Sequence, residues 1–145
     1  MLEKEPLEKF FIEEIKVIQD IIKRLAFNSF MIKGWAITLV VVTLLLKGDK
    51  YQVLISFIPL IVFWFLNAYF LWQERMYRKL YDWVISNRLK TDEYLFDMNA
   101  YRFEGDVQSK FRIMFSITLG WFYGCIAILI VMYILVLFSS KQGGN

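Results

Sequence analysis

The residues of this sequence that could carry function are polar and basic side chains set among apolar ones, because the usual catalytic residues are missing. The chain has no His and a single Cys, Cys125, which excludes His-based acid–base catalysis, His metal sites and an intrachain disulfide. It contains no glycine-rich phosphate loop and no HExxH or GxSxG motif. The side chains of adjacent acids such as Glu13 and Glu14 point in different directions on a helix, so they cannot act together on one atom. We therefore expect no enzymatic activity, no cofactor and no metal.

Lys33 and Asn67 are the first candidate site, since both lie inside apolar runs. The polar tip at 47–50 joins those runs, so residues equally far from it share a depth, and Lys33 lies level with Asn67 about one turn inside the membrane boundary. In one interpretation Lys33 extends to the lipid headgroups while Asn67 caps a backbone group. In the other, both face a polar interior, as a pore lining or an inter-subunit contact. Thr38 and Thr43 extend this polar trace along the first span.

Small residues form the second candidate site. Ser116, Gly120 and Gly124 recur every four residues in the last apolar run, and such a series lets another helix approach closely. The pattern predicts a packing face, and it leaves open whether the partner helix belongs to the same chain or to another subunit.

Basic and aromatic side chains between residues 73 and 112 form the third candidate site. They suit phosphates and stacked bases, or anionic lipid headgroups. The net charge of this region is only +1, which argues against strong non-specific nucleic-acid binding. For Arg75, Arg78 and Lys79 the alternative is an ordinary cluster of positive charge beside a membrane. The candidate ligand-binding residues are Arg75, Arg78, Lys79, Arg88, Lys90, Arg102, Lys110, Arg112, Trp83, Tyr94 and Tyr101.

Composition indicates the elements that hold these sites. Of the 145 residues 58% are hydrophobic and the mean hydropathy is +0.45, too apolar for a soluble domain of this size. The sequence predicts an all-α integral membrane protein with three transmembrane helices, an N-terminal amphipathic helix and cytoplasmic helical extensions. In order, we expect an amphipathic helix at 1–28, a transmembrane hairpin at 29–72, a helical basic and aromatic region at 73–112, a third span at 113–138 and a disordered tail at 139–145.

The amphipathic helix carries a heptad-like apolar stripe, which includes Phe11, Ile18 and Leu25. The stripe predicts either packing on the same protein or the membrane surface, or self-association. The first 26 residues hold six acids and no long apolar core, so we expect no cleaved signal peptide.

Local signals predict where the other helices bend and end. Pro59 frees the carbonyl of Ile55, so we expect a kink there, with Ser56 satisfying part of the freed backbone. The second span should continue as a helix to about residue 90, and Thr91 should cap a new helix. A final helix should start near Asp106 and run into the third span.

Charge distribution predicts the topology. Residues 1–33 hold six Lys and Arg and residues 73–112 hold eight, against two at 47–52 and one in the tail. By the positive-inside rule the N-terminus and 73–112 face the cytoplasm, and the C-terminus faces outward. The expected location is the bacterial inner (plasma) membrane.

The hairpin contains the segments Asn28-Ser29-Phe30-Met31-Ile32-Lys33-Gly34-Trp35 and Ile58-Pro59-Leu60, Phe63-Trp64, Asn67-Ala68-Tyr69-Phe70-Leu71-Trp72-Gln73-Glu74-Arg75 and Tyr77-Arg78-Lys79-Leu80-Tyr81. These segments resemble a family of small bacterial membrane proteins, and the resemblance covers about positions 25–85. It extends to the transmembrane effector of Hailong-type anti-phage defence systems. That resemblance implies a homo-oligomeric channel that a cytosolic nucleotidyltransferase partner, or the oligonucleotide it makes, holds closed, and whose opening depolarises the cell.

Three spans fill the space between them with their own side chains, so conduction would require an oligomer. The alternative function is a non-conducting membrane anchor or scaffold that recruits a soluble enzyme through residues 1–28 and 73–112.

Overall fold

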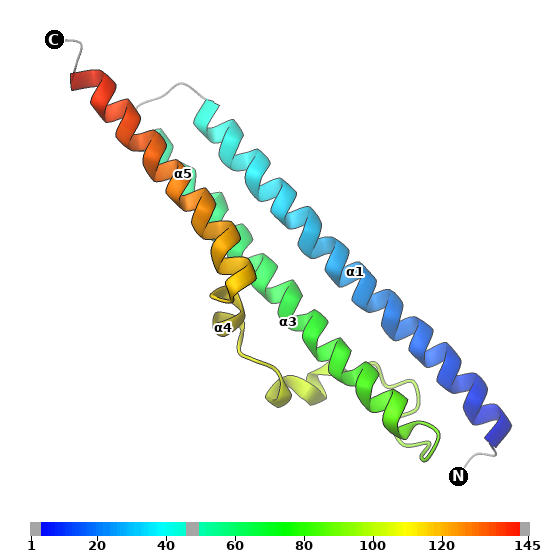
Figure 1. Cartoon of the computed structure of the whole chain (residues 1–145). Coiled ribbons are helices and arrows are strands. Elements are labelled where there is room, and N and C mark those ends of the chain that lie inside the picture. Colours follow the sequence, from blue (N-terminus) through cyan, green and yellow to red (C-terminus); the bar gives the residue numbers. More distant parts are fainter. Residues whose placement is uncertain (1–3, 46–49, 143–145) are drawn as a thin grey trace. The chain divides into compact units, whose positions relative to one another are not determined.

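Three long helices dominate the structure (Figure 1), a computed structural model that describes residues 4–45 and 50–142. All regular structure in these residues is helical, which confirms the predicted all-α class. Three helices, at Pro6–Leu45, Val53–Asn87 and Ile117–Leu137, are long and apolar enough to cross a membrane. The elements are α1 (Lys4–Leu45), α2 (Lys50–Ile55), α3 (Phe57–Asn87), the 3-10 helix η1 (Ala100–Asp106), α4 (Lys110–Met114) and α5 (Ile117–Gln142).

The chain forms two compact units, and α1 and α3 each contribute to both. The polar unit comprises Met1–Ser29 and Phe70–Ser109, and the apolar unit comprises Phe30–Tyr69 and Lys110–Asn145. The predicted amphipathic helix and the region after the second span therefore fold together. The two spans of the hairpin and the third span form the other unit.

In the polar unit the apolar stripes of α1 and α3 meet. Side-chain contacts pair Gln19 with Tyr81, and Glu14 with Arg88 directly after α3, so the start of α1 runs antiparallel to the end of α3. This arrangement favours packing on the same protein as the role of the N-terminal stripe, rather than self-association. The buried apolar residues of the two helices here are Leu7, Ile18, Leu25, Trp72, Met76, Leu80 and Val84.

The core of the apolar unit is built from small and aliphatic side chains. Ala36 and Ala68 are at most 1% exposed, which indicates that their helices pack closely on neighbours. The other buried apolar residues of this unit are Ile32, Val40, Val53, Leu60, Ile113, Leu119, Tyr123 and Ile130.

Helix α3 is preceded by a break at Ser56, which confirms the predicted distortion near Pro59. The Ser56 hydroxyl donates to the carbonyl of Val53 at 2.6 Å, and its N–H lies 3.1 Å from the same oxygen. Pro59 supplies no N–H to the carbonyl four residues earlier, so the helix restarts at Phe57. The rest of the predicted tip, residues 47–49, lies outside the described residues.

Helix α3 continues past Trp72 without interruption to Asn87, as predicted. Its end is marked by Ser86 and Asn87, whose side chains donate back to the carbonyls of Asp82 and Trp83 at 2.8 and 2.9 Å. Such local bonds compete with the continuing helix.

The prediction of a helix capped by Thr91 is wrong. The Thr91 hydroxyl accepts the N–H of Glu93 at 3.2 Å within a turn, and no helix follows directly. The prediction of one final helix from Asp106 is also wrong, because Val107 is extended (φ −116°, ψ 145°) and α4 starts only at Lys110.

The third stretch that is apolar enough to cross a membrane ends at Leu137, in agreement with the predicted end of the third span at Phe138. Helix α5 runs on to Gln142, because Lys141 and Gln142 are good helix formers that extend an already formed helix at little cost. The predicted disordered tail is therefore wrong for 139–142, and 143–145 lie outside the described residues.

Candidate functional site

Asn67 is fully buried in the apolar unit and is hydrogen-bonded to α5. Its Nδ2 donates to the Tyr123 hydroxyl at 3.2 Å, and that hydroxyl donates to the carbonyl of Phe63 at 3.1 Å. Burying an amide and a phenol among apolar side chains is costly unless both are bonded. The Asn67–Tyr123 pair therefore fixes the register of α5 against α3.

Trp64 holds the junction between α4 and α5. Its indole N–H donates to the carbonyl of Met114 at 2.8 Å, and its ring stacks on Tyr123 with centroids 5.7 Å apart. In an unbroken helix that carbonyl would accept the N–H of Thr118. The indole bond thus satisfies the backbone at the break between the two helices.

Lys33 lies half-buried in the apolar unit, with its Nζ 5.9 Å from the centroid of the Phe122 ring. This distance is within the range of a cation–π interaction. Lys33 and Asn67 thus contact successive residues of α5, Phe122 and Tyr123. Their predicted common level agrees with these contacts, and each has a partner on α5.

Thr38 and Thr43 bond within their own helix. Their hydroxyls donate to the carbonyls of Gly34 at 3.0 Å and Leu39 at 2.7 Å. Bonds of this kind let a Thr side chain sit in an apolar environment, so both residues are satisfied without a polar neighbour on another helix.

Replacing Tyr123 by Phe is expected to lower the free energy of unfolding by about 0.6–1.7 kcal/mol, the range for hydrogen bonds between helices in a membrane. The change removes the hydroxyl that accepts from Asn67. Denaturant titration of the full chain in detergent, followed by Trp fluorescence, measures it. Tyr133→Phe is the matched control, because Tyr133 is exposed and makes one bond at 3.3 Å. Equal effects of the two changes would contradict the role of Tyr123.

The predicted small-residue face of α5 points away from the core of its own chain. An added Cβ at Gly124 would meet nothing within 4 Å, and at Gly120 it would meet only backbone atoms of Phe115 at 3.8 Å. Leu119, Tyr123 and Ile130 are buried on a different side of the helix, about a quarter of a turn away from the glycines. The close approach that these glycines permit is therefore not used within the described chain.

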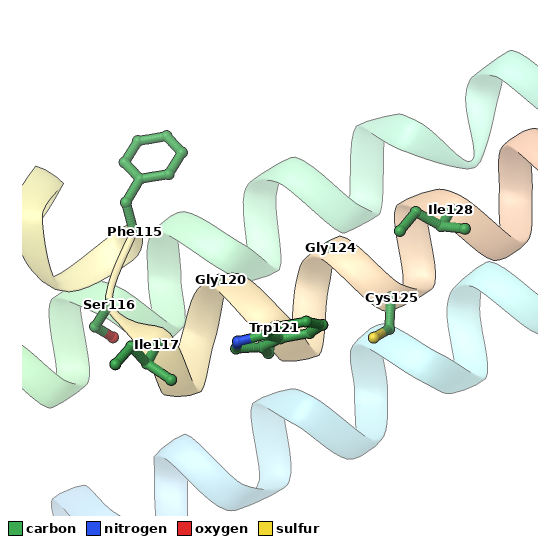
Figure 2. A pocket seen from close by; sticks show the side chains of 8 residues that line it. All are labelled: Phe115, Ser116, Ile117, Gly120, Trp121, Gly124, Cys125 and Ile128. Atoms are coloured by element: carbon green, nitrogen blue, oxygen red, sulfur yellow. The ribbon is translucent and has the colours of Figure 1, made fainter.

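A shallow groove of about 360 Å³ runs along this face of α5, and Figure 2 shows the residues that line it. Trp121 is 71% exposed and Ile117 is 82% exposed. Ser116 precedes α5 rather than lying in it, and its hydroxyl is buried without a hydrogen-bond partner in the described residues. The lining residues are Phe115, Ser116, Ile117, Gly120, Trp121, Gly124, Cys125 and Ile128.

Arg88, a predicted ligand residue, is instead fully buried in a bidentate ion pair with Glu14. Its Nε lies 2.5 Å from Glu14 Oε2, and its Nη2 lies 2.8 Å from Oε1. The remaining guanidinium donors bond the carbonyls of Thr91, Glu93 and Tyr94 at 2.6–3.3 Å. Every N–H of Arg88 is thereby directed at the protein, so this side chain is not free to bind a ligand.

Arg102 is enclosed by three aromatic rings of the polar unit. Its guanidinium carbon lies 4.2 Å from the centroid of Tyr94, 5.2 Å from that of Trp83 and 5.6 Å from that of Phe103. Asp97 provides the opposite charge at 3.8 Å. The structure thus brings together three predicted ligand residues, Arg102, Trp83 and Tyr94. They contact one another rather than an open site.

The loop around this cluster contains two bulky residues in the left-handed region, Tyr94 (φ 56°) and Phe96 (φ 55°). Such conformations cost about 1–2 kcal/mol each. The carbonyl bond from Arg88 to Tyr94, at 3.0 Å, and the contact between the Phe96 and Phe10 rings hold the loop in place.

The other predicted ligand residues are divided between the two units. In the polar unit, Arg78 pairs with Glu74, whereas Lys79 and Lys90 are exposed. Lys110 and Arg112 belong to the apolar unit, and Lys110 Nζ lies 5.7 Å from the centroid of Tyr69. Arg75 and Tyr101, the last two predicted ligand residues, belong to the polar unit and are hydrogen-bonded there. Arg75 Nη1 donates to Gln108 Oε1 at 3.0 Å, and the Tyr101 hydroxyl accepts from Gln73 at 3.4 Å.

Sequence reasoning missed Glu14 and Tyr123. A signal for Glu14 existed, because it lies seven residues after Leu7 and four before Ile18, inside the apolar stripe. A buried carboxylate requires a partner, and Arg88 is the residue that meets it. In the described part of the chain no group of three or more His, Cys, Asp or Glu side chains could hold a metal ion.

Comparison with known proteins finds no matching family model, no similar curated protein and no similar solved structure.

Proposed function

We propose that this chain is a homo-oligomeric membrane effector whose assembled spans form a gated pore in the bacterial plasma membrane. It acts in anti-phage defence, with the N-terminus in the cytoplasm and the C-terminus outside. The observation that carries the proposal is the open face of α5. Gly120 and Gly124 permit close helix approach, yet no helix of the described chain approaches them.

A second copy is the partner that suits this face best. The glycines let the backbones of two copies approach closely, so two copies of this face can meet across a two-fold axis. Only 17% of the most apolar stretch of α5 is buried within the chain, which leaves area for such contacts.

The polar residues of the spans support an assembly rather than a pore inside one chain. Asn67, Thr38 and Thr43 are bonded within the apolar unit. Lys33 is a charged residue of the apolar unit close to the start of the first span, and its side chain is partly exposed. In the assembled protein Lys33 lies at the inner mouth of the pore.

Gating requires a mechanical connection between the cytoplasmic region and the spans. Helix α3 passes without a break from the apolar unit into the polar unit, so a change in the polar unit can act on the spans through it. The resemblance of residues 25–85 to Hailong-type effectors supports control by a cytosolic nucleotidyltransferase or its oligonucleotide.

The test is expression of the full chain in a bacterium without its neighbouring genes, while a voltage-sensitive dye reports the membrane potential. We expect depolarisation and arrested growth, because no ligand holds the pore closed. Gly124→Ile at equal membrane abundance is the control and should preserve the potential. An unchanged potential with the wild-type chain verified in the membrane would overturn the pore, and recruitment of a soluble enzyme at unchanged potential would support a scaffold.

A further inference from the structure

The polar unit contains a pocket that is distinct from the aromatic cluster around Arg102. It has a volume of about 490 Å³ and is lined by Gln19, Ile22, Lys23, Arg78, Tyr81 and Asp82. This volume is within the range of ~300–1,000 Å³ of small-molecule sites. Two of the lining residues are bonded to each other, since Gln19 Nε2 donates to the Tyr81 hydroxyl at 3.1 Å and so joins α1 to α3.

The cationic side of the pocket is only partly used by the protein. Arg78 directs Nε and Nη2 at a single oxygen of Glu74, at 2.9 and 2.7 Å, which leaves Nη1 for another acceptor. Lys23 has one loose ion pair, with Asp20 at 3.6 Å, and its side chain is 75% exposed. The Tyr81 hydroxyl accepts from Gln19 and so retains its own proton to donate.

These donors come from two helices and converge on one space. A guanidinium, an ammonium and a phenol are the donors that bind phosphate oxygens well. Asp82 lines the same pocket, and its carboxylate repels a bare anion but accepts from an ammonium or hydroxyl group. The Gln19 Oε1 atom offers a second acceptor.

We infer that the pocket bounded by Lys23, Arg78, Tyr81 and Asp82 binds a phosphate ester that carries a hydrogen-bond donor close to its phosphate. The phosphate lies on Lys23, Arg78 and the Tyr81 hydroxyl, and the donor group lies on Asp82. A phospholipid headgroup and a soluble nucleotide share this chemistry. Binding here does not depend on the chain being a channel, whereas its use to control a pore rests on the proposed function.

The experiment uses the full chain in nanodiscs of phosphatidylcholine, whose choline group has no N–H to donate. Calorimetric titration with O-phosphoethanolamine and with AMP should give saturable binding, and inorganic phosphate should bind about tenfold more weakly or worse because Asp82 repels it. The double change Lys23→Gln and Arg78→Gln should weaken the binding of both esters by about tenfold or more. Asp82→Asn should reduce the preference for the esters over inorganic phosphate.

The matched control is the double change Arg24→Gln and Lys79→Gln, which removes the same charge from the adjacent positions of the same helices but outside the pocket lining. It should keep binding within about twofold of the wild type. Equal loss in both double variants would show general attraction of anions and would overturn the site. Lys23→Glu, at an exposed side chain, repeats the test without touching the pair of Arg78 with Glu74.

A second arm separates the two sources of phosphate. Nanodiscs with and without phosphatidylethanolamine are analysed by native mass spectrometry for lipid retained by the chain. Retained phosphatidylethanolamine that is lost in the Lys23→Gln and Arg78→Gln variant identifies a lipid site, and saturable AMP binding without lipid retention identifies a soluble ligand. If no ester binds saturably and lipid retention is the same in both proteins, the inference is wrong. Either binding result leaves the depolarisation test unaffected, so the two proposals fail separately.

Discussion

Replacing Arg88 by Met is expected to lower the free energy of unfolding of the polar unit by about 3–5 kcal/mol, because it leaves a buried carboxylate without its counter-charge. Glu14 is fully buried and meets Arg88 through two short bonds. The same change also removes the donors to the carbonyls of Thr91, Glu93 and Tyr94.

Hydrogen exchange of the full chain in detergent, read by mass spectrometry, measures this loss. Protection of the amides at 7–25 and 72–87 should fall by about 100-fold or more, since each 1.4 kcal/mol is tenfold. The double change Glu14→Leu and Arg88→Met should recover part of the protection, because no charge then remains buried. Lys90→Met, at an exposed position in the same turn, is the control and should stay within ~0.5 kcal/mol of the wild type. Wild-type protection in Arg88→Met would contradict the structural role of the pair.

Replacing Gly124 by Ile is expected to reduce the homo-oligomer by about tenfold or more while each chain keeps its fold. The added side chain would fill the space where a second helix approaches, and a tenfold loss corresponds to about 1.4 kcal/mol. Within the chain it meets open space, because nothing lies within 4 Å of a Cβ at this position. The change should therefore weaken the oligomer without unfolding the single chain.

Chemical cross-linking in membranes and light scattering in detergent both measure the oligomer. Gly34→Ile is the matched control, since a Cβ at Gly34 in α1 also meets nothing within 4 Å, and it should leave the oligomer intact. An oligomer of wild-type abundance in the Gly124→Ile protein would contradict the α5 face as the interface. A monomer whose helix content also falls, as seen by circular dichroism, would show that the fold rather than the interface was lost.

Local features of the sequence were sufficient to predict most helices. Apolar runs of sufficient length predict α1, α3 and α5, because a helix satisfies its backbone within one segment. The break at Ser56 and the pair of Glu74 with Arg78 also follow from residues three or four positions apart. The failed predictions, a cap at Thr91 and a helix from Asp106, fall in the loop between α3 and α4. There the backbone follows Arg88 and its partners rather than local propensity.

The sequence by itself determined that this protein is all-helical, that three helices can cross a membrane, and that most basic residues lie at 1–33 and 73–112 rather than at 47–52 or in the tail. These properties depend on composition and on periodicity within single segments. Only the tertiary structure decided that Glu14 meets Arg88 and that Asn67 meets Tyr123. Each pair joins helices far apart in sequence, and each exists because a buried polar group must find a partner wherever the fold provides one. The same packing, which buries Tyr123, leaves Gly120 and Gly124 on the open face of α5.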